Sequence, residues 1–387
     1  MNNPKIAISI NLLVALQRYQ DLYSGIKDYS KKHTNWKVVW DHFPEYKLQQ
    51  SQKKPYYDGI IGRIKKVTYE EASRLKIPMV NTWVGNDLEH LPAVLPDMKE
   101  AGFVAAKHLL NRGFRNFVNI DNRKDKASSA FYEGVLAALK PHKIPLKRYL
   151  INRTTGENGK QWVKFCNDFS DWAKDWQFPL AICSSTSCFG PNITSRCLEN
   201  NLRVPEDVAF ISAINDHAYC ERHSPKTSSV DVNLEKIGYE AARMLHRQMK
   251  GEVLEENRIF IPLTGVVARE STDTFAIDDK NVKMAMRFIA NNINEHIDVS
   301  DIVEAVPISR RTLELRFSST IGHSIKDEIN RLRVISLKRL LLESDMNLNQ
   351  LSQQSGFSTA KHMTRVFQKC TGMSPKEYRD AIKNNEL

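Results

Sequence analysis

The sequence has few of the features that mark secreted, membrane-spanning or zinc-binding proteins. Its 387 residues include only six cysteines, and these show neither a C-x-x-C pair nor the Cys/His spacing of a zinc site. No apolar run reaches the roughly 18 residues that cross a bilayer, and the first residues lack the apolar core of a signal peptide. We therefore expect a cytoplasmic chain with reduced thiols and no metal.

Motifs that bind nucleotides or build catalytic centres are also missing. The chain has no G-x-G-x-x-G, no P-loop and no G-x-S-x-G elbow. We therefore expect no cofactor, no catalytic residue and no enzymatic activity. Its eleven histidines and many carboxylates could still converge in space. An enzyme on an α/β domain stays open as an alternative, as does a small-molecule binding protein with an accessory helical tail.

Positive charge is in excess, with 56 Lys and Arg against 45 Asp and Glu, a net charge of +11. Such a balance favours a polyanionic partner. Residues 276–387 carry 17 basic and 14 acidic side chains, a net of only +3, so most of the excess lies in the larger N-terminal part. Within this tail, however, residues 310–339 hold eight basic and three acidic side chains, and residues 361–379 hold five and one. The tail therefore has two local basic segments.

Residues 1–272 alternate short β-rich runs, such as KIAISI, YDGIIGRI, PLAICSS and DVAFISAI, with amphipathic stretches. Helices are predicted at 97–111, around 131–139 and at 234–249. Strands and helices at this spacing predict parallel sheets with right-handed crossovers, and a stretch of this length suits two doubly wound lobes. Small ligands bind outside the carboxyl ends of strands in such folds. An α/β effector-binding domain is predicted, followed by a linker at 273–281.

Residues 282–387 are expected to form an all-α domain, and they contain a repeated unit. Residues 298–324 and 347–374 each show a short helix, a tight turn, a Ser and a second helix with apolar residues four apart. Two such helices form a helix-turn-helix unit, whose second helix enters the major groove of DNA. The Ser of each unit, Ser309 or Ser358, can cap the second helix, whose exposed N–H groups favour phosphate.

Helical geometry sorts the side chains of the two second helices. If Leu313/Phe317 and Met363/Phe367 face the core, the side chains between them face outward. Arg and Lys donate to guanine, Glu accepts from cytosine, and small residues leave room for the thymine methyl. For the cations, contact with phosphate alone remains the alternative. The predicted outward residues are Arg310, Arg311, Glu314, Ser318, Ala360, Lys361, Thr364 and Arg365.

The segment between the units, SIKDEINRLRVISLKRLLLES, has the period of a helix of about 20 residues, or roughly 30 Å. This length approximates one turn of B-DNA, roughly 34 Å. One subunit is therefore expected to read two successive major-groove segments on one face of double-stranded DNA. A homodimer would then need two such sites, arranged as repeats.

Each unit of the tail carries a signature. The first has Ser-Arg-Arg-x-Leu-x-x-x-Phe and Gly-His-Ser, and the second ends in Gly-x-Ser-Pro-x-x-Tyr-Arg. These resemble the tandem DNA-binding domain of the AraC/XylS family of bacterial transcription regulators. One departure is Pro307, which stands at the family's turn glycine and cannot take a positive φ. Either this turn is built differently or the first unit docks less faithfully. The resemblance implies base-reading positions at Arg311, Glu314, Leu315, Ala360, Lys361, Thr364 and Arg365.

The N-terminal part has signatures of its own, RYQDLYSGIKDYS, PDMKEAGFVAAKHLLNRGFRNF, NLRVPEDVAFISAIND and VVARESTD. They resemble the effector-binding domain of LacI/GalR repressors, which has a periplasmic-binding-protein-like fold. A LacI-like sensor followed by an AraC-type reader is the arrangement of the xylose-operon activators. The resemblance implies a regulator, expected to activate a catabolic operon. Its implied partners are double-stranded DNA, a small-molecule effector, a second copy of the chain and RNA polymerase.

The expected effector pocket departs from this resemblance. Three positions that hold sugar hydroxyls in LacI-type sensors align with Phe131, Ser187 and Ile214. Because a pocket that lacks buried polar groups loses selectivity for hydroxyls, the effector is expected to be sugar-derived or less hydroxylated. Compensation by Asp216 and loss of ligand binding are the alternatives. The candidate pocket residues are Asn11, Arg18, Trp83, Asp97, Arg123, Asn215 and Asp216.

Overall fold

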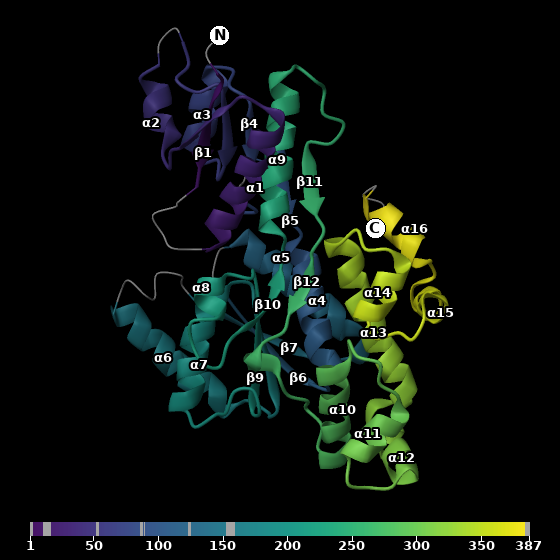
Figure 1. Ribbon diagram of the computed structural model, residues 1–387. Coiled ribbons are helices and arrows are strands. Elements are labelled where there is room, and N and C mark those ends of the chain that lie inside the picture. The colour runs from purple at the N-terminus through teal and green to yellow at the C-terminus, as the bar shows by residue number, and fades with distance from the viewer. Residues whose placement is uncertain are drawn as a thin grey trace. The chain divides into compact units, whose positions relative to one another are not determined.

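The computed structural model describes residues 3–10, 17–51, 54–85, 88, 90–122, 125–151 and 159–383. The chain divides into two compact units (Figure 1). Unit 1 comprises Met1–Leu109 and Arg115–Asp273, and unit 2 comprises Leu110–Phe114 and Thr274–Leu387. None of the helices in the described ranges is long and apolar enough to cross a membrane.

Unit 1 contains two lobes, each built on a six-stranded sheet. The first sheet has the strand order β11-β5-β4-β3-β1-β2, and its strands all run parallel. Its strands are Lys5–Ser9 (β1), Lys37–Trp40 (β2), Gly59–Gly62 (β3), Met79–Asn81 (β4), Ala93–Pro96 (β5) and Arg258–Ile261 (β11). Its helices are Gln17–His33 (α1), Pro44–Gln49 (α2), Lys66–Arg74 (α3) and Leu234–Met249 (α9).

Helices cover both faces of this sheet. Successive strand residues point to opposite faces, so in β1 the side chains of Ile6 and Ile8 pack with α1 and α9, whereas Ala7 packs on the side of α2 and α3. A parallel sheet buried on both faces needs continuous apolar strands. This explains why its strands appear as unbroken apolar runs in the sequence.

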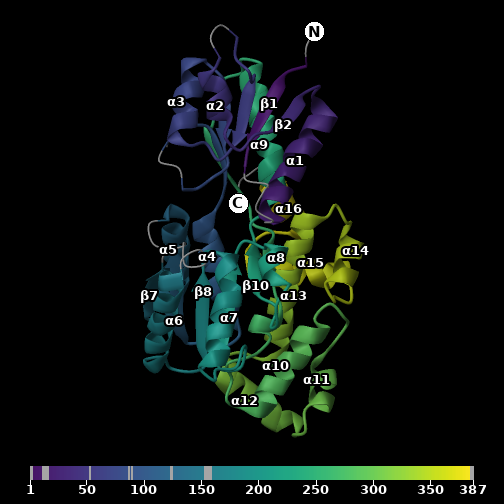
Figure 2. The same ribbon diagram turned by 90° about the vertical axis from the view of Figure 1, so that its left-hand side faces the viewer.

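The second sheet has the order β12-β10-β9-β8-β6-β7 and is parallel except that β12 runs antiparallel to β10. The chain crosses between the lobes three times, after β5, β10 and β11. Helices of this lobe flank its sheet in Figure 2. Its strands are Asn116–Asn122 (β6), Leu146–Ile151 (β7), Leu180–Ser184 (β8), Val208–Ala213 (β9), Ser228–Asp231 (β10) and Gly265–Val267 (β12). Its helices are Met98–Asn111 (α4), Lys126–Leu139 (α5), Gly159–Lys174 (α6), Gly190–Glu199 (α7) and His217–Cys220 (α8).

The prediction of two doubly wound parallel-sheet lobes is confirmed, with additions. The additions are strands that were not predicted from the sequence (β5, β7 and β10) and helices that were not predicted (α2, α3, α6 and α8). The helix predicted around 131–139 begins five residues earlier, at Lys126, where Asp125 caps it by accepting from Ala127 N.

Unit 2 is all-α, as predicted, with two helix-turn-helix units. One core lies among α10, α11, α12 and the start of α13, and the other lies among α13, α14, α15 and α16. The stretch predicted as a linker contributes Phe275 and Ile277 to the first core. The helices are Lys280–Asn292 (α10), Val299–Ala305 (α11), Arg310–Ile321 (α12), Ile325–Glu343 (α13), Leu348–Gln354 (α14), Ala360–Thr371 (α15) and Pro375–Lys383 (α16).

The two helix-turn-helix units differ in their turns. In the first, the N–H of Ile308 donates to the carbonyl of Val306 (2.8 Å), which closes a γ-turn centred on Pro307. The common form of this turn has a negative central φ, so proline fits it. In the second, Gly356 has a φ of +72° and Phe357 N bonds back to α14, the pattern of a Schellman cap. The first turn is therefore built differently.

The turn at Gly356 also packs against the backbone of the segment between α10 and α11. A Cβ added there would stand 2.4 Å from the carbonyl oxygen of Ile293 and 2.6 Å from that of Glu295. Arg333, in α13, is only 5% exposed and donates from Nη2 to the carbonyls of Glu295 (3.1 Å) and Ile297 (3.0 Å). The turn of the second unit is thus packed on the segment that leads into the first.

Replacing Gly356 with Ala is expected to destabilise the protein by at least about 3 kcal/mol, because the positive φ and the clash with two carbonyls add. Gly372→Ala is the matched control. Gly372 also has a positive φ, of +80°, but no atom lies within 4 Å of an added Cβ, so a loss of about 1 kcal/mol is expected. Urea denaturation followed by circular dichroism measures both, and equal losses would show that the close approach costs nothing.

Candidate nucleic-acid interface and effector site

We call the second helix of each helix-turn-helix unit its reading helix, which is α12 in the first unit and α15 in the second. Helix α12 presents its predicted residues to solvent. Ser309 caps it as predicted, since its hydroxyl accepts from Thr312 N (3.3 Å). Leu313 and Phe317 are buried, and the opposite side is open. The exposed predicted residues are Arg310, Arg311, Glu314 and Leu315.

The second reading helix, α15, begins one residue later than expected. Its cap is Thr359, whose hydroxyl accepts from His362 N (3.1 Å), so the prediction that Ser358 caps this helix was wrong. The turn before α15 is one residue longer than the turn before α12, which moves the capping position. Met363 and Phe367 are buried. Lys361, Arg365 and Ser358 are exposed, and Ala360 and Thr364 are half-buried.

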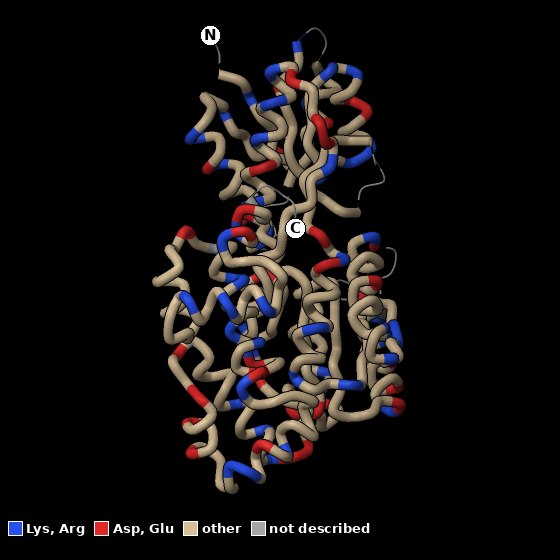
Figure 3. The backbone as a smooth tube through the Cα atoms, turned by 90° about the vertical axis from the view of Figure 1, so that its right-hand side faces the viewer, with Lys and Arg blue, Asp and Glu red and all other residues tan. Residues whose placement is uncertain are grey.

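The cations of the two helices differ in their pairing. Arg310 bonds to Glu314 (2.9 Å) one turn further along α12. In contrast, Arg311, Lys361 and Arg365 form no hydrogen bond or ion pair with the residues that the structure describes. The second helix therefore offers two unpaired cations to a partner and the first offers one. Figure 3 shows Lys and Arg interspersed with Asp and Glu over the backbone.

The described candidates for the effector site lie where strands of unit 1 end. Trp83 follows β4, and the guanidinium carbon of Arg63 stacks 3.5 Å from the centre of its ring. Asp97 follows β5, but its carboxylate accepts from Glu100 N (2.9 Å) and serves as a helix cap. Arg18 stands at the start of α1, with its Nε buried and without a hydrogen-bond partner among the described residues. Two further candidates, Asn11 and Arg123, lie outside the described residues.

The last two candidates follow β9 and have different surroundings. Three hydrogen bonds hold Asn215: its amide oxygen accepts from Arg269 Nη2 (2.7 Å) and Ser229 Oγ (3.1 Å), and its nitrogen donates to Asp231 (3.3 Å). Asp216 is fully buried.

The Oδ1 atom of Asp216 accepts from Ala218 N (3.2 Å) and, from the other lobe, from Gln17 N (3.3 Å). Its Oδ2 atom has no hydrogen-bond partner among the described residues. This oxygen is the acceptor that a ligand could use.

The three positions that depart from the sugar-binding pattern are placed as follows. Phe131 is fully buried within α5. Ser187 is 1% exposed, and its hydroxyl has no hydrogen-bond partner among the described residues. Ile214 has a φ of +72°, which is an outlier for a β-branched residue. Two of the three positions thus offer a ligand no polar side chain.

Asp121 was not among the predicted residues, although it stands near the end of β6, where the strand-end rule could have found it. Its carboxylate is fully buried and accepts from Ser185 N (3.1 Å) and Arg148 Nη2 (3.4 Å). Burial raises the pKa of Asp121 to about 6, although the hydrogen bond from Ser185 and the charge of Arg148 act against this shift. Sequence reasoning also missed Arg269, which holds Asn215.

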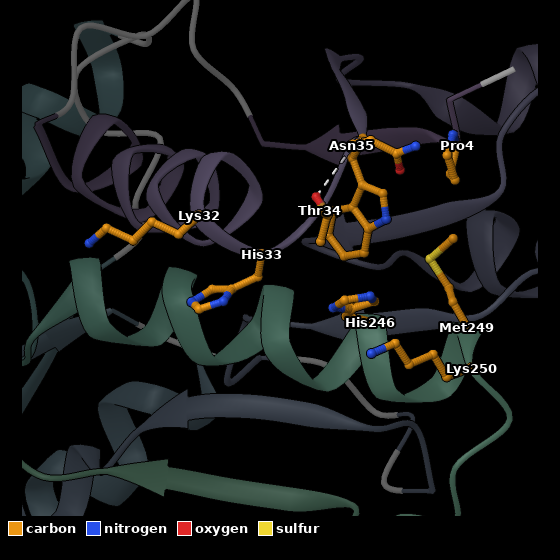
Figure 4. A pocket seen from close by; sticks show the side chains of 9 residues that line it. Pro4, Lys32, His33, Thr34, Asn35, His246, Met249 and Lys250 are labelled. Atoms are coloured by element: carbon orange, nitrogen blue, oxygen red, sulfur yellow. Dashed lines mark hydrogen bonds between the residues drawn. The ribbon is translucent and has the colours of Figure 1, made fainter.

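A separate pocket of about 620 Å³ lies at the other end of the first sheet. Pro4 and Trp36, which line it, precede β1 and β2, so it opens at the amino ends of these strands. Figure 4 shows His246 among the side chains that line it, and the ring centres of Trp36 and His246 lie 5.4 Å apart. None of the predicted site residues lines this pocket, which separates it from the edge where such folds bind ligands.

Comparison with known proteins defines the class. Residues 106–272 match a periplasmic binding protein-like domain, and residues 302–381 match a helix-turn-helix domain. The chain thus joins a periplasmic binding protein-like domain to a helix-turn-helix domain. Over more than half of its length the chain is similar to xylose operon regulatory proteins.

Its relatives agree with this assignment. The xylose operon regulatory protein of Escherichia coli K12 is 30% identical over 228 residues, which span 59% of this chain and 58% of that protein. That of Haemophilus influenzae is 24% identical over 75% of each chain. A structure described as the xylose-binding transcription activator xylR covers 98% of this chain and 99% of its own, with a TM-score of 0.62 and 23% identity. The CcpA regulator of Lactococcus lactis covers 70% of this chain, with a TM-score of 0.59 and 17% identity.

The pKa of Asp121 predicts a pH dependence of stability. Because its folded pKa lies above the unfolded value, the folded state keeps a proton that the unfolded state releases between roughly pH 4 and 6. The stability contributed by this group is present at low pH and is lost as pH rises through that window. Between pH 4 and 7, wild type should therefore lose up to about 3 kcal/mol relative to Asp121→Asn.

Urea denaturation across this pH range measures the difference between the two proteins. Asp171→Asn, which removes an exposed carboxylate of the same lobe, is the control and should track wild type. A constant difference between wild type and Asp121→Asn would contradict the assignment.

Proposed function

We propose that this chain is a sequence-specific, DNA-binding transcription regulator that activates a catabolic operon in response to a small molecule bound in unit 1. The observation that carries the proposal is the pair of reading helices, each with a buried apolar side, a capped N-terminus and, on its open side, at least one cation without a partner among the described residues. Capped N-termini and free cations suit the phosphates and base edges of DNA. The relatives' names, which are those of transcription regulators, support it.

In this proposal the chain works in the cytoplasm as a homodimer, on repeated sites in double-stranded DNA and together with RNA polymerase. The linking helix α13 has 19 residues and is therefore about 28 Å long. This length suits two major-groove segments one turn apart on the same face of DNA. The DNA-facing set is Ser309, Arg310, Arg311, Glu314, Leu315, Ser358, Ala360, Lys361, Thr364 and Arg365.

Replacing Lys361 or Arg365 with Ala is expected to weaken binding to the DNA upstream of the gene by about 1–3 kcal/mol, because each is an unpaired cation that can donate to guanine. Gel-shift titration at several salt concentrations measures the loss. If a residue touches only phosphate, the loss would be the same for all sequences and the salt dependence would fall.

Lys164→Ala is the matched control, since Lys164 is exposed and paired with Asp168 in unit 1. It should bind like wild type. Normal DNA binding by both the Lys361 and the Arg365 variants at every salt concentration would remove α15 from the interface.

For the effector we propose a sugar-derived or less hydroxylated compound rather than a simple pentose or hexose. Phe131 and Ile214 provide no polar side chain where LacI-type sensors hold hydroxyls. The stacked pair of Arg63 and Trp83 instead offers an aromatic surface and a cation. Asp216 remains as a buried acceptor. The proposed pocket is Asn11, Arg18, Trp83, Asp97, Arg123, Asn215 and Asp216.

Calorimetry of the full chain with D-xylose and D-glucose is therefore expected to show no micromolar binding. A thermal-shift screen of sugars, polyols, uronates and small aromatic compounds would then identify the class that does bind. Micromolar binding of either sugar that Asp216→Ala abolishes, and that the control Asp171→Ala leaves intact, would show that Asp216 replaces the missing groups and that the proposed class is wrong.

A further inference from the structure

The two reading helices can be superposed position by position, because both begin directly after their cap and bury residues at the same steps. Leu313 and Phe317 are the fourth and eighth residues of α12, and Met363 and Phe367 are the fourth and eighth of α15. The numbering therefore differs by 50 throughout. At the sixth position of α12 stands Leu315, and at the sixth position of α15 stands Arg365.

This sixth position is the one most remote from the core. A helix turns about 100° per residue, so the direction midway between the fourth and eighth residues points about 180° away from the sixth. The structure agrees: Leu315 is 63% exposed, and Arg365 is exposed as well. Any surface that docks on the open side of α12 or α15 is therefore contacted first by Leu315 or Arg365.

The surroundings of Leu315 make an apolar contact the available one. The neighbouring Arg310 and Glu314 bind each other at 2.9 Å, and Arg316 is directed to Asp279 of α10 (3.3 Å). One oxygen of Glu314 is therefore engaged within the helix. On this side of α12, Arg311 is a cation without a partner among the described residues, and the side chain of Leu315 is an exposed apolar group.

The chemistry of the base edges then gives the two helices different base preferences. In the major groove only thymine presents an apolar group, its methyl, whereas guanine presents two acceptors that suit a guanidinium. We propose that Leu315 is a specificity-determining residue that packs on a thymine methyl, and that Arg365, at the equivalent position, selects guanine. Each subunit then requires a thymine in one half-site and a guanine in the other. This inference rests on the proposed DNA-binding function.

The test begins with selection of duplexes from a library randomised over about two helical turns of DNA, using the full chain. In the enriched duplex, each thymine is then replaced in turn by deoxyuridine, which lacks only the methyl. At one position wild type is expected to bind about fourfold more weakly, the effect of one buried methyl group. Leu315→Ala should bind the thymine and deoxyuridine duplexes equally.

Two further variants separate a reading role from a structural one. Arg365→Ala should keep the fourfold ratio between thymine and deoxyuridine, but lose preference for guanine in the other half-site by about tenfold or more. Leu136→Ala, which truncates an exposed Leu of α5 in unit 1, should behave as wild type in every assay. Circular dichroism checks that Leu315→Ala folds, as expected for a largely exposed side chain.

The possible outcomes distinguish a failure of the DNA-binding function from a failure of the base preference inferred for Leu315. If the library yields no enriched sequence, the DNA-binding function fails and this inference fails with it. If an enriched duplex binds tightly but no deoxyuridine position affects wild type, the function stands and the inference is overturned. The inference is also overturned if Leu315→Ala keeps the fourfold ratio.

Discussion

One close approach holds the two helix-turn-helix units together, and it leaves no room for a side chain. The turn at Gly356 lies on the carbonyl groups of Ile293 and Glu295, and Arg333 donates to the second of these beside it. Three residues later, Asp298 caps the first helix of the first unit. The same short stretch therefore anchors both units. Because α13 also contributes side chains to both cores, the two reading helices are held at one spacing, which is what a reader of successive grooves requires.

In the effector lobes, the polar groups at the strand ends divide into two kinds. Asp97 and Asn215 are engaged within the protein, by helix capping and by Arg269 respectively. Asp216 and Ser187 are buried, yet each keeps an oxygen without a partner among the described residues. A buried polar atom without a partner costs about 1–3 kcal/mol. A ligand that supplied the missing donor would regain this free energy, so these two groups are the polar acceptors that the proposed pocket has to offer.

Helices and strands whose apolar residues recur at a regular period could be predicted from the sequence. Those held by residues far away in the sequence could not. The helix at 234–249 was predicted with its observed bounds, because its apolar residues recur at the helical period and pack on the first sheet. Strand β10, with the sequence SSVD, was missed because its buried residues are mostly serines. Their hydroxyls are satisfied by groups some 40 positions away, such as the contacts of Ser228 with Arg269 and Thr272. The misplaced cap at Ser358 has a similar origin, since one extra turn residue is visible only in the fold.

By itself the sequence determined that an α/β domain precedes a domain with two helix-turn-helix units. It also determined which side of each reading helix is apolar and which is polar. These features depend on residues three or four positions apart, whose geometry a helix imposes locally. Only the tertiary structure decided which of these groups are engaged. Arg316 is directed away from the reading face by Asp279, 37 positions distant, and Asp121 acquires its raised pKa from burial among strands that meet only in the folded lobe. Charge pairing and burial depend on distance in space, which periodicity along the chain does not encode.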